Sequence, residues 1–174
     1  MITIWKKDAL RSRVEHASGG RQTVLYTQRG QPSYLNVVTR HDLAAGHHPA
    51  FVLNGQPRQE FFYGTYGGVI RDGELLSLPG QPPASGMDFD QACAAARACG
   101  PGWHLATNAE RAALVQWARE QGWSPRGNTD QGRDAVAPQD AGQRVDGLAA
   151  GRADGNPATP VSYTHLRAHE TKAN

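Results

Sequence analysis

Residues 102–110 read Gly-Trp-His-Leu-Ala-Thr-Asn-Ala-Glu, and the last four of them have the pattern of a helix start. Thr107 and Glu110 are spaced as in a capping box, in which a hydroxyl and a carboxylate satisfy backbone amides of the first turn. Apolar residues follow at helical spacing as far as Gly122, a typical stop. The pattern therefore predicts a helix that ends near Gly122, with residues 102–105 before it as an extended link.

A second capping box lies shortly before this one. Asp88 is followed three residues later by Gln91, and Gly100-Pro101 ends the segment, so the sequence predicts a helix between them. Its buried face is expected to consist of Phe89, Ala92, Cys93 and Ala96. The proline-rich run at 78–83 cannot enter a helix interior or a sheet ladder, and we expect an exposed connection there.

The N-terminal part of the chain predicts one helix and several strands. Residues 7–17 carry apolar side chains at helical spacing, and strand-like runs at 23–26 and 34–38 predict a hairpin. Asn54-Gly55 is a type I′ turn pattern in a second sheet region, which ends in the aromatic run 60–66. The aromatic side chains expected to pack in the core are Phe61, Phe62, Tyr63 and Tyr66.

The composition describes a loop-rich chain with little net charge. Its 174 residues include 20 glycines and 11 prolines, and 18 Lys and Arg against 16 Asp and Glu leave a formal net charge of +2. So small a charge argues against a dedicated binder of nucleic acid or anionic lipid. The start of the chain lacks the apolar core of a signal peptide, and no apolar run reaches membrane-spanning length. We therefore expect no membrane insertion.

The two cysteines are the first candidates for chemistry. Cys93 and Cys99 lie six positions apart in one predicted helix, so the helical rise alone separates them by about 9 Å. That spacing is beyond the reach of a disulfide. Inert core cysteines are therefore favoured over a catalytic pair.

Histidines are the second candidates. A metal site could involve His41, Asp42, His47 and His48, but adjacent histidines point apart in an extended segment and no second ligand cluster accompanies them. A solvated loop is therefore favoured, and no metal or cofactor is predicted. His104 is predicted to be a half-buried histidine with one hydrogen-bond partner rather than a general base.

The stretch from residue 124 to Pro160 shows turn after turn and no periodicity. Its spaced aspartates could suggest a lectin-like calcium loop, yet neither an EF-hand nor a lectin calcium pattern is present, so turn formation is favoured. These aspartates are Asp130, Asp134, Asp140, Asp146 and Asp154.

Residues 161–174 differ in kind from the rest. The run Val-Ser-Tyr-Thr-His-Leu-Arg-Ala-His-Glu-Thr at 161–171 resembles a translation of the transposase adaptor used in short-read sequencing libraries. We interpret 161–174 as an adaptor-derived artefact and leave it out of the fold prediction. The natural protein is then expected to continue differently after Pro160.

Several of these segments together resemble one known family. Residues 51–55, the aromatic run 60–66, the helix from Asp88 and the block 102–111 are similar to the first half of a formylglycine-generating-enzyme-like (sulfatase-modifying factor) domain. That domain is a variant of the C-type-lectin fold. The phage and prophage members are the most similar, because they share the block and a following Arg-Gly-Asn run like that at 126–128.

One position departs from the family pattern. The family usually has a tryptophan immediately after the glutamate of the block, where this chain has Arg111. The loss of a core aromatic would weaken local packing, and Trp117 and Trp123 are the residues that could compensate for it.

The resemblance implies an α+β, C-type-lectin-like domain at 49–160 that is truncated at its C-terminus. A small α/β lead-in of helix and hairpin precedes it at 1–48. Catalytic members of the family carry a cysteine pair or iron ligands mostly in the C-terminal half, whereas noncatalytic members contact a host through exposed side chains near the C-terminus. In both cases the functional residues are expected beyond Pro160, and no catalytic or metal-binding residue is assigned before it.

The favoured function is that of a noncatalytic phage or prophage tail-associated receptor-recognition protein, found in the virion or in the bacterial cytoplasm before assembly. Its expected partners are a bacterial cell-surface receptor, other tail proteins and further copies of itself in a homo-oligomer. Two alternatives stay open. One is an enzyme of the formylglycine-generating or non-haem-iron oxidoreductase type whose active site is cut off, and the other is a structural virion component.

Overall fold

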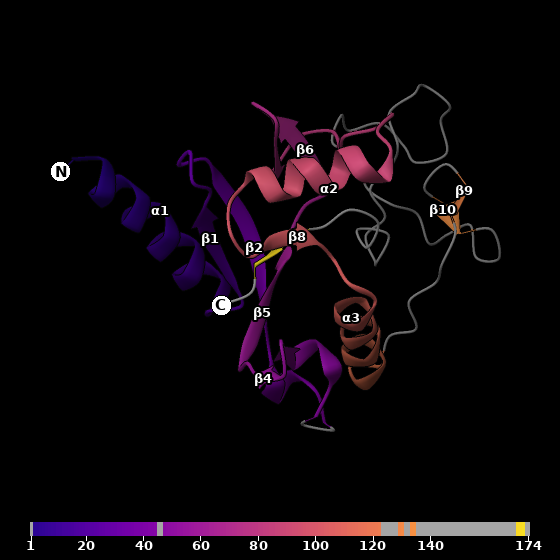
Figure 1. Ribbon diagram of the computed structural model, residues 1–174. Coiled ribbons are helices and arrows are strands. Elements are labelled where there is room, and N and C mark those ends of the chain that lie inside the picture. The colour runs from indigo at the N-terminus through magenta and orange to yellow at the C-terminus, as the bar shows by residue number, and fades with distance from the viewer. Residues whose placement is uncertain (1, 45–46, 123–128, 131–132, 135–169, 173–174) are drawn as a thin grey trace.

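The computed structural model describes residues 2–44, 47–122, 129–130, 133–134 and 170–172 (Figure 1). These residues form three α-helices and several small antiparallel sheets, which confirms the α+β class. Within these ranges, none of the helices combines the length and the apolar character that a membrane crossing requires.

A three-stranded antiparallel sheet in the order β1-β2-β5 forms the centre of the fold (Figure 1). β1 spans Gln22–Tyr26, β2 spans Pro32–Thr39 and β5 spans Glu60–Gly64. The predicted hairpin is confirmed, with Val24 opposite Tyr34. β2 pairs on its other side with β5, so strands from the lead-in and from the segment after it share one sheet.

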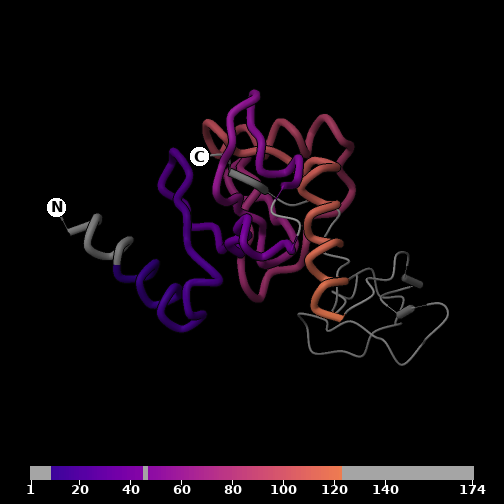
Figure 2. Tube along the Cα trace, turned by 90° about the horizontal axis from the view of Figure 1, so that it is seen from below, coloured from indigo at the N-terminus to yellow at the C-terminus, as the bar shows by residue number. Residues whose placement is uncertain are grey.

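Two helices lie on opposite sides of the described fold (Figure 2). α1 spans Ile2–Ser18 and packs against β1, and it begins earlier than the predicted residue 7. It ends at Gly19 and Gly20, whose φ angles of +62° and +81° are unfavourable for residues that carry a side chain. α3 spans Asn108–Glu120, as its capping box predicts.

The central sheet is buried on both faces at β5. Phe61 and Phe62 are consecutive, yet their exposed fractions are only 0% and 7%. Because successive side chains of a strand point to opposite faces, the two rings enter different clusters. Phe61 belongs to the cluster that contains Leu114 of α3, whereas Phe62 belongs to the one that contains Trp103. The predicted burial of the aromatic run is thus confirmed, except that Tyr66 is only half-buried.

Two short hairpins form the middle of the chain. Their strands are β3 (Val52–Leu53), β4 (Gln56–Pro57), β6 (Gly68–Arg71) and β7 (Glu74–Ser77). Asn54-Gly55 joins the first pair with φ angles of +50° and +77°, which confirms the type I′ turn. Asp72-Gly73 joins the second pair with φ angles of +53° and +79°. This second hairpin lies outside the sequence predictions, although its turn has the same pattern.

Helix α2 spans Phe89–Ala98 and packs against β7. Its predicted capping box is confirmed, because the Gln91 amide donates to Asp88 Oδ1 at 2.8 Å. The predicted buried face is wrong at Phe89, which is 73% exposed. The buried stripe runs through positions 92, 95, 96 and 99, so it starts almost one turn after Phe89. The connection before α2 is free of helix and strand and largely exposed, as the prolines at 79, 82 and 83 predict.

The extended link before α3 is a strand. β8 spans Trp103–Leu105 and pairs antiparallel with β11, which spans Glu170–Lys172 and also lies next to β5 (Figure 1). β11 belongs to the segment 161–174, and the remainder of that segment lies outside the described residues. Over these three residues the edge of β8 therefore has a strand partner.

Candidate functional site

The start of α3 holds a cluster of charged side chains around one buried carboxylate. The side chain of Glu110 is only 1% exposed. Its Oε2 accepts hydrogen bonds from the amide and the hydroxyl of Thr107, both at 2.9 Å, and the Glu110 amide donates to the Thr107 hydroxyl at 3.2 Å. The predicted capping box is therefore confirmed, and its carboxylate turns away from solvent.

A cation on a distant segment balances this charge. Arg58 follows the β3–β4 hairpin, and its Nη2 donates to Glu110 Oε1 at 2.7 Å. Its Nε donates to the Ala50 carbonyl at 2.7 Å, and its guanidinium carbon lies 5.5 Å from the centre of the Phe61 ring. Arg58 Nη1 is buried without a hydrogen-bond partner in the described part of the chain. The ion pair thus joins the hairpin to α3 inside the core.

His104 completes the cluster from β8. Its Nε2 lies 3.2 Å from Glu110 Oε2, and its Nδ1 lies 3.0 Å from the Gly102 carbonyl oxygen. Both neighbours accept hydrogen bonds, so only the imidazolium, which carries a proton on each nitrogen, can make both bonds at once. The prediction of a single partner is therefore wrong, because the backbone of Gly102 and the carboxylate of Glu110 flank the ring.

The contacts of the cluster shift two pKa values. Burial raises the pKa of Glu110, but the hydrogen bonds from His104, Thr107 and Arg58 outweigh it and bring the pKa down to about 2. Burial lowers the pKa of His104, but the hydrogen bond and the charge of Glu110 outweigh it and raise that pKa. At neutral pH the carboxylate is therefore an ion whose lone pairs are occupied, which makes it a structural anchor rather than a proton acceptor.

The two cysteines considered from the sequence are both free thiols. Cys99 is buried at the end of α2, and its Sγ donates to the Leu75 carbonyl at 3.1 Å. Cys93 is partly exposed.

The predicted loop histidines have local structural contacts. Asp42 caps the 3-10 turn η1 (Arg40–Asp42) by accepting from the amide and hydroxyl of Thr39 at 2.7 and 2.8 Å. His48 precedes the turn η2 (Pro49–Phe51), and its Nδ1 accepts from the Ala50 amide at 3.1 Å. Among the residues that the structure describes, no group of three or more His, Cys, Asp or Glu side chains could hold a metal ion.

The aspartates after residue 124 are described only in part. Asp130 ends the two-residue strand β9 (Thr129–Asp130), and Asp134 ends its partner β10 (Arg133–Asp134). The other positions named from the sequence lie outside the described residues: Trp123, Asp140, Asp146, Asp154 and Pro160.

Arg111 does not occupy a core position. It is exposed on the outer face of α3, so an arginine there leaves no gap in the core. The half-buried Trp117 packs against the cluster of Phe61 and Leu114 instead. The expected weakening of local packing at position 111 is therefore not seen, because the side chain points away from the sheet.

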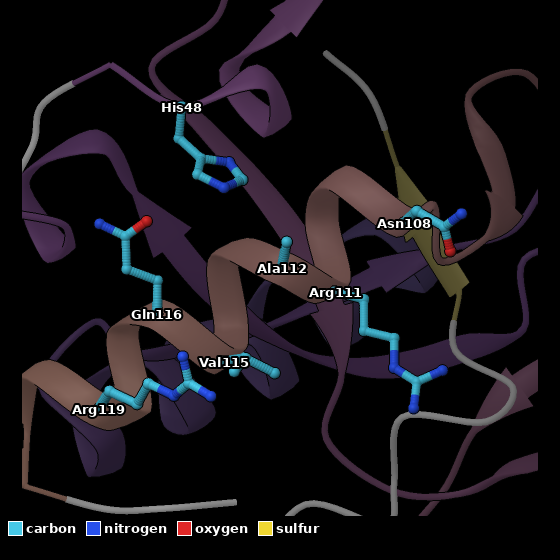
Figure 3. Close-up of a pocket in the computed structure, with 7 residues that line it drawn as sticks. All are labelled: His48, Asn108, Arg111, Ala112, Val115, Gln116 and Arg119. Carbon is cyan, nitrogen blue, oxygen red and sulfur yellow. The ribbon is translucent and has the colours of Figure 1, made fainter.

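This outer face of α3 borders a groove with a volume of about 510 Å³ (Figure 3). Two rows of side chains at i, i+4 spacing line it, and His48 faces them from the loop (Figure 3). The rows are Asn108, Ala112 and Gln116, and Arg111, Val115 and Arg119. The groove was not predicted, although the fourfold spacing of these residues along a helix was readable from the sequence.

Two other hollows lie nearby. One of about 450 Å³ shares His48 with the groove and is also lined by Arg40, His47 and Val52. The other, of about 710 Å³, lies between the end of α1, β2 and Trp117 of α3.

No protein-family model matches the chain. A comparison with curated proteins likewise finds no match.

Proposed function

We propose that this chain is part of a noncatalytic binding protein with a C-type-lectin-like scaffold, used by a phage or prophage tail to recognise a host cell. One observation carries the proposal. The block at 102–110 resembles phage members of the family, and its two ionisable side chains are engaged: Glu110 is bound by His104 of the block and by Arg58 from a distant segment. A saturated cluster of this kind positions a helix and has no free group for acid–base chemistry.

The surface next to the cluster supports a binding role. α3 is fixed at its start by the buried ion pair, and its outer face presents two arginines and two amides to solvent. Side chains on a rigid helix keep their geometry better than side chains on a loop. The principal receptor contacts are proposed to follow Pro160, in the natural continuation of the chain.

Long-read sequencing of the locus in its source DNA is the first test. The proposal expects codons after Pro160 that differ from those of 161–174, which would identify that segment as adaptor-derived. It also expects the continuation to lack a paired cysteine motif and a histidine-rich iron site. Either of these motifs would favour the enzyme alternative.

A binding assay with the full-length product is the second test. Fluorescently labelled protein should bind host bacteria saturably, and an excess of unlabelled protein should displace it. Absence of binding to every strain that carries the prophage or a relative of it would overturn the proposal and favour a structural virion component. Conversion of a cysteine-containing peptide to the formylglycine form by the same protein would favour the enzyme.

A further inference from the structure

The groove on α3 has an unusual distribution of charge. Arg111 and Arg119 line it together with His48, and no aspartate or glutamate is among its lining residues. Neither arginine side chain forms an ion pair or a hydrogen bond with another described residue. Two acids flank the arginines along the helix. Glu110, which precedes Arg111, is buried and bound by Arg58 and His104, and Glu120, which follows Arg119, is held by the Ala44 amide at 3.1 Å and by Gln116 at 2.9 Å.

Arg111 is not explained by the stability of the helix. It lies in the first turns of α3, where a positive charge opposes the helix dipole, and it is exposed rather than packed in the core. Arg119 lies in the last turn, where the dipole favours a cation. Both guanidinium groups are therefore open to a ligand from outside the described part of the chain.

The spacing of the two cations restricts the ligand. They are eight residues apart on one helix, so their backbones are separated by about 12 Å along the axis. Figure 3 shows the two guanidinium groups apart from each other, with Val115 between them, so in this arrangement a single small anion does not contact both. A chain with regularly spaced anionic groups can reach both, and the second hollow, which shares His48 with the groove, adds His47 to the same surface.

The residues between the arginines indicate the chemistry of the chain. Ala112 and Val115 form a small apolar strip, and the amides of Asn108 and Gln116 can donate to and accept from hydroxyl groups. No aromatic side chain is among the described residues that line the groove, so these residues offer no platform on which nucleic-acid bases would stack. The formal net charge of +2 also argues against nucleic acid as the ligand.

We propose that this groove binds an acidic polysaccharide, with Arg111 and Arg119 each contacting a carboxylate or other anionic group of the glycan and the amides contacting its hydroxyls. The inference deepens the proposed host recognition by giving it a second binding surface within α3 and a class of ligand. Arginine suits this task because its guanidinium forms two parallel hydrogen bonds with a carboxylate.

Titration of the purified full chain with oligogalacturonate, a carboxylated glycan, tests the inference. We expect saturable binding that weakens as salt rises, since the contacts are between exposed charges. The double variant R111E/R119E should bind at least about tenfold more weakly. The matched control is R97E, which reverses an exposed arginine on α2 and should bind like the original chain. A circular-dichroism melt of each variant shows that the fold is retained.

Three outcomes would overturn the inference. They are the absence of glycan binding, equal loss in R97E, and equal or tighter binding of neutral dextran, polyglutamate or a single-stranded oligonucleotide. The cell-binding assay separates this inference from the proposed function. If R111E/R119E binds cells like the original protein, the groove is not the glycan site although host recognition stands. If the original protein binds glycan but no cells, host recognition fails instead.

Discussion

Two glutamates are buried in this fold, and different groups replace the water around their carboxylates. Glu110, at the start of α3, is bound by Arg58 and His104 as well as by its helix cap. Glu74, at the start of β7, is 0% exposed, and its Oε2 accepts only from the neutral Thr27 hydroxyl and Gln31 amide, at 2.9 and 2.6 Å. Its Oε1 is buried without a hydrogen-bond partner among the described residues.

The difference shows that burial alone does not define the role of a carboxylate. A buried charge is tolerated when a cation and several donors replace the water that it lost. Glu110 has such a replacement, so its negative charge contributes to the fold. Glu74 has neutral donors on one oxygen only, so its contribution rests on hydrogen bonds rather than on charge. Substitutions at the two sites should therefore have unequal effects.

Removal of the cation should have the largest effect. Arg58→Met places an apolar side chain of similar length there, but it leaves the buried Glu110 carboxylate without its guanidinium partner, with only His104 and Thr107 bound to it. We expect the free energy of unfolding to fall by about 3–5 kcal/mol, measured by urea denaturation. Arg97→Met, on the exposed face of α2, is the control and should change it by less than about 0.5 kcal/mol. Equal effects of the two variants would show that the ion pair contributes nothing.

Glutamine has the shape of glutamate without its charge, so the same substitution at both sites compares the stability contributions of the two charges directly. Glu110→Gln loses the charge-assisted bonds to Arg58 and His104, and we expect it to cost about 2–3 kcal/mol. Glu74→Gln keeps an oxygen for Thr27 and Gln31, and its cost should be below about 1 kcal/mol. Denaturant unfolding of both variants at pH 7 gives the ranking. The reverse ranking would refute the distinction drawn between the two sites.

Acid should gradually abolish the contribution of Glu110 to the free energy of unfolding. Its pKa of about 2 in the fold is below the ordinary value of 4.5, so the stabilisation is complete above pH 4.5 and is lost as the pH falls toward 2. The shift corresponds to about 3 kcal/mol. The difference in stability between the original chain and Glu110→Gln should therefore shrink as the pH falls through this range. A difference that stays constant from pH 5 to pH 2 would contradict the assignment.

Substitution of His104 should have the smallest effect on the free energy of unfolding. Its contribution should fall as the pH rises, whereas that of Glu110 falls as the pH drops. Its pKa is raised above 6.5, so its contribution is complete below pH 6.5 and is lost as the pH rises through the value in the fold. We expect His104→Gln to cost about 1 kcal/mol at pH 6 and less at pH 9, because the side chain is partly exposed. An NMR titration of the imidazole provides the direct measurement, and a midpoint below 6.5 would overturn the expectation.

Local patterns in the sequence predicted local structure well. Both capping boxes, the Asn54-Gly55 turn and the first hairpin are confirmed, because each depends on residues only a few positions apart. The β6–β7 hairpin has an equally local turn pattern at Asp72-Gly73, so the sequence could have predicted it in the same way as the Asn54-Gly55 turn. Phe89 was placed wrongly because a helix period fixes which residues share a face but not which turn meets the sheet.

The candidate site was less accessible to such reasoning. Nothing near Arg58 in the sequence indicates that it meets Glu110, since the two residues are 52 positions apart. The two partners of His104, Gly102 and Glu110, are only two and six positions away, but the bond to Glu110 depends on how β8 is oriented against α3. Likewise, the consecutive aromatics of β5 lack the alternation of a half-buried strand, because the structure covers that strand on both faces.

The distance along the chain between Arg58 and Glu110 also sets an order of events during synthesis. At about 5–20 residues per second, a ribosome adds Glu110 about 3–10 s after Arg58. The hairpin of β1 and β2 consists of near neighbours and can form within that time. The guanidinium of Arg58, in contrast, stays hydrated until Glu110 has been added. The ion pair can therefore form only after the start of α3 has been synthesised.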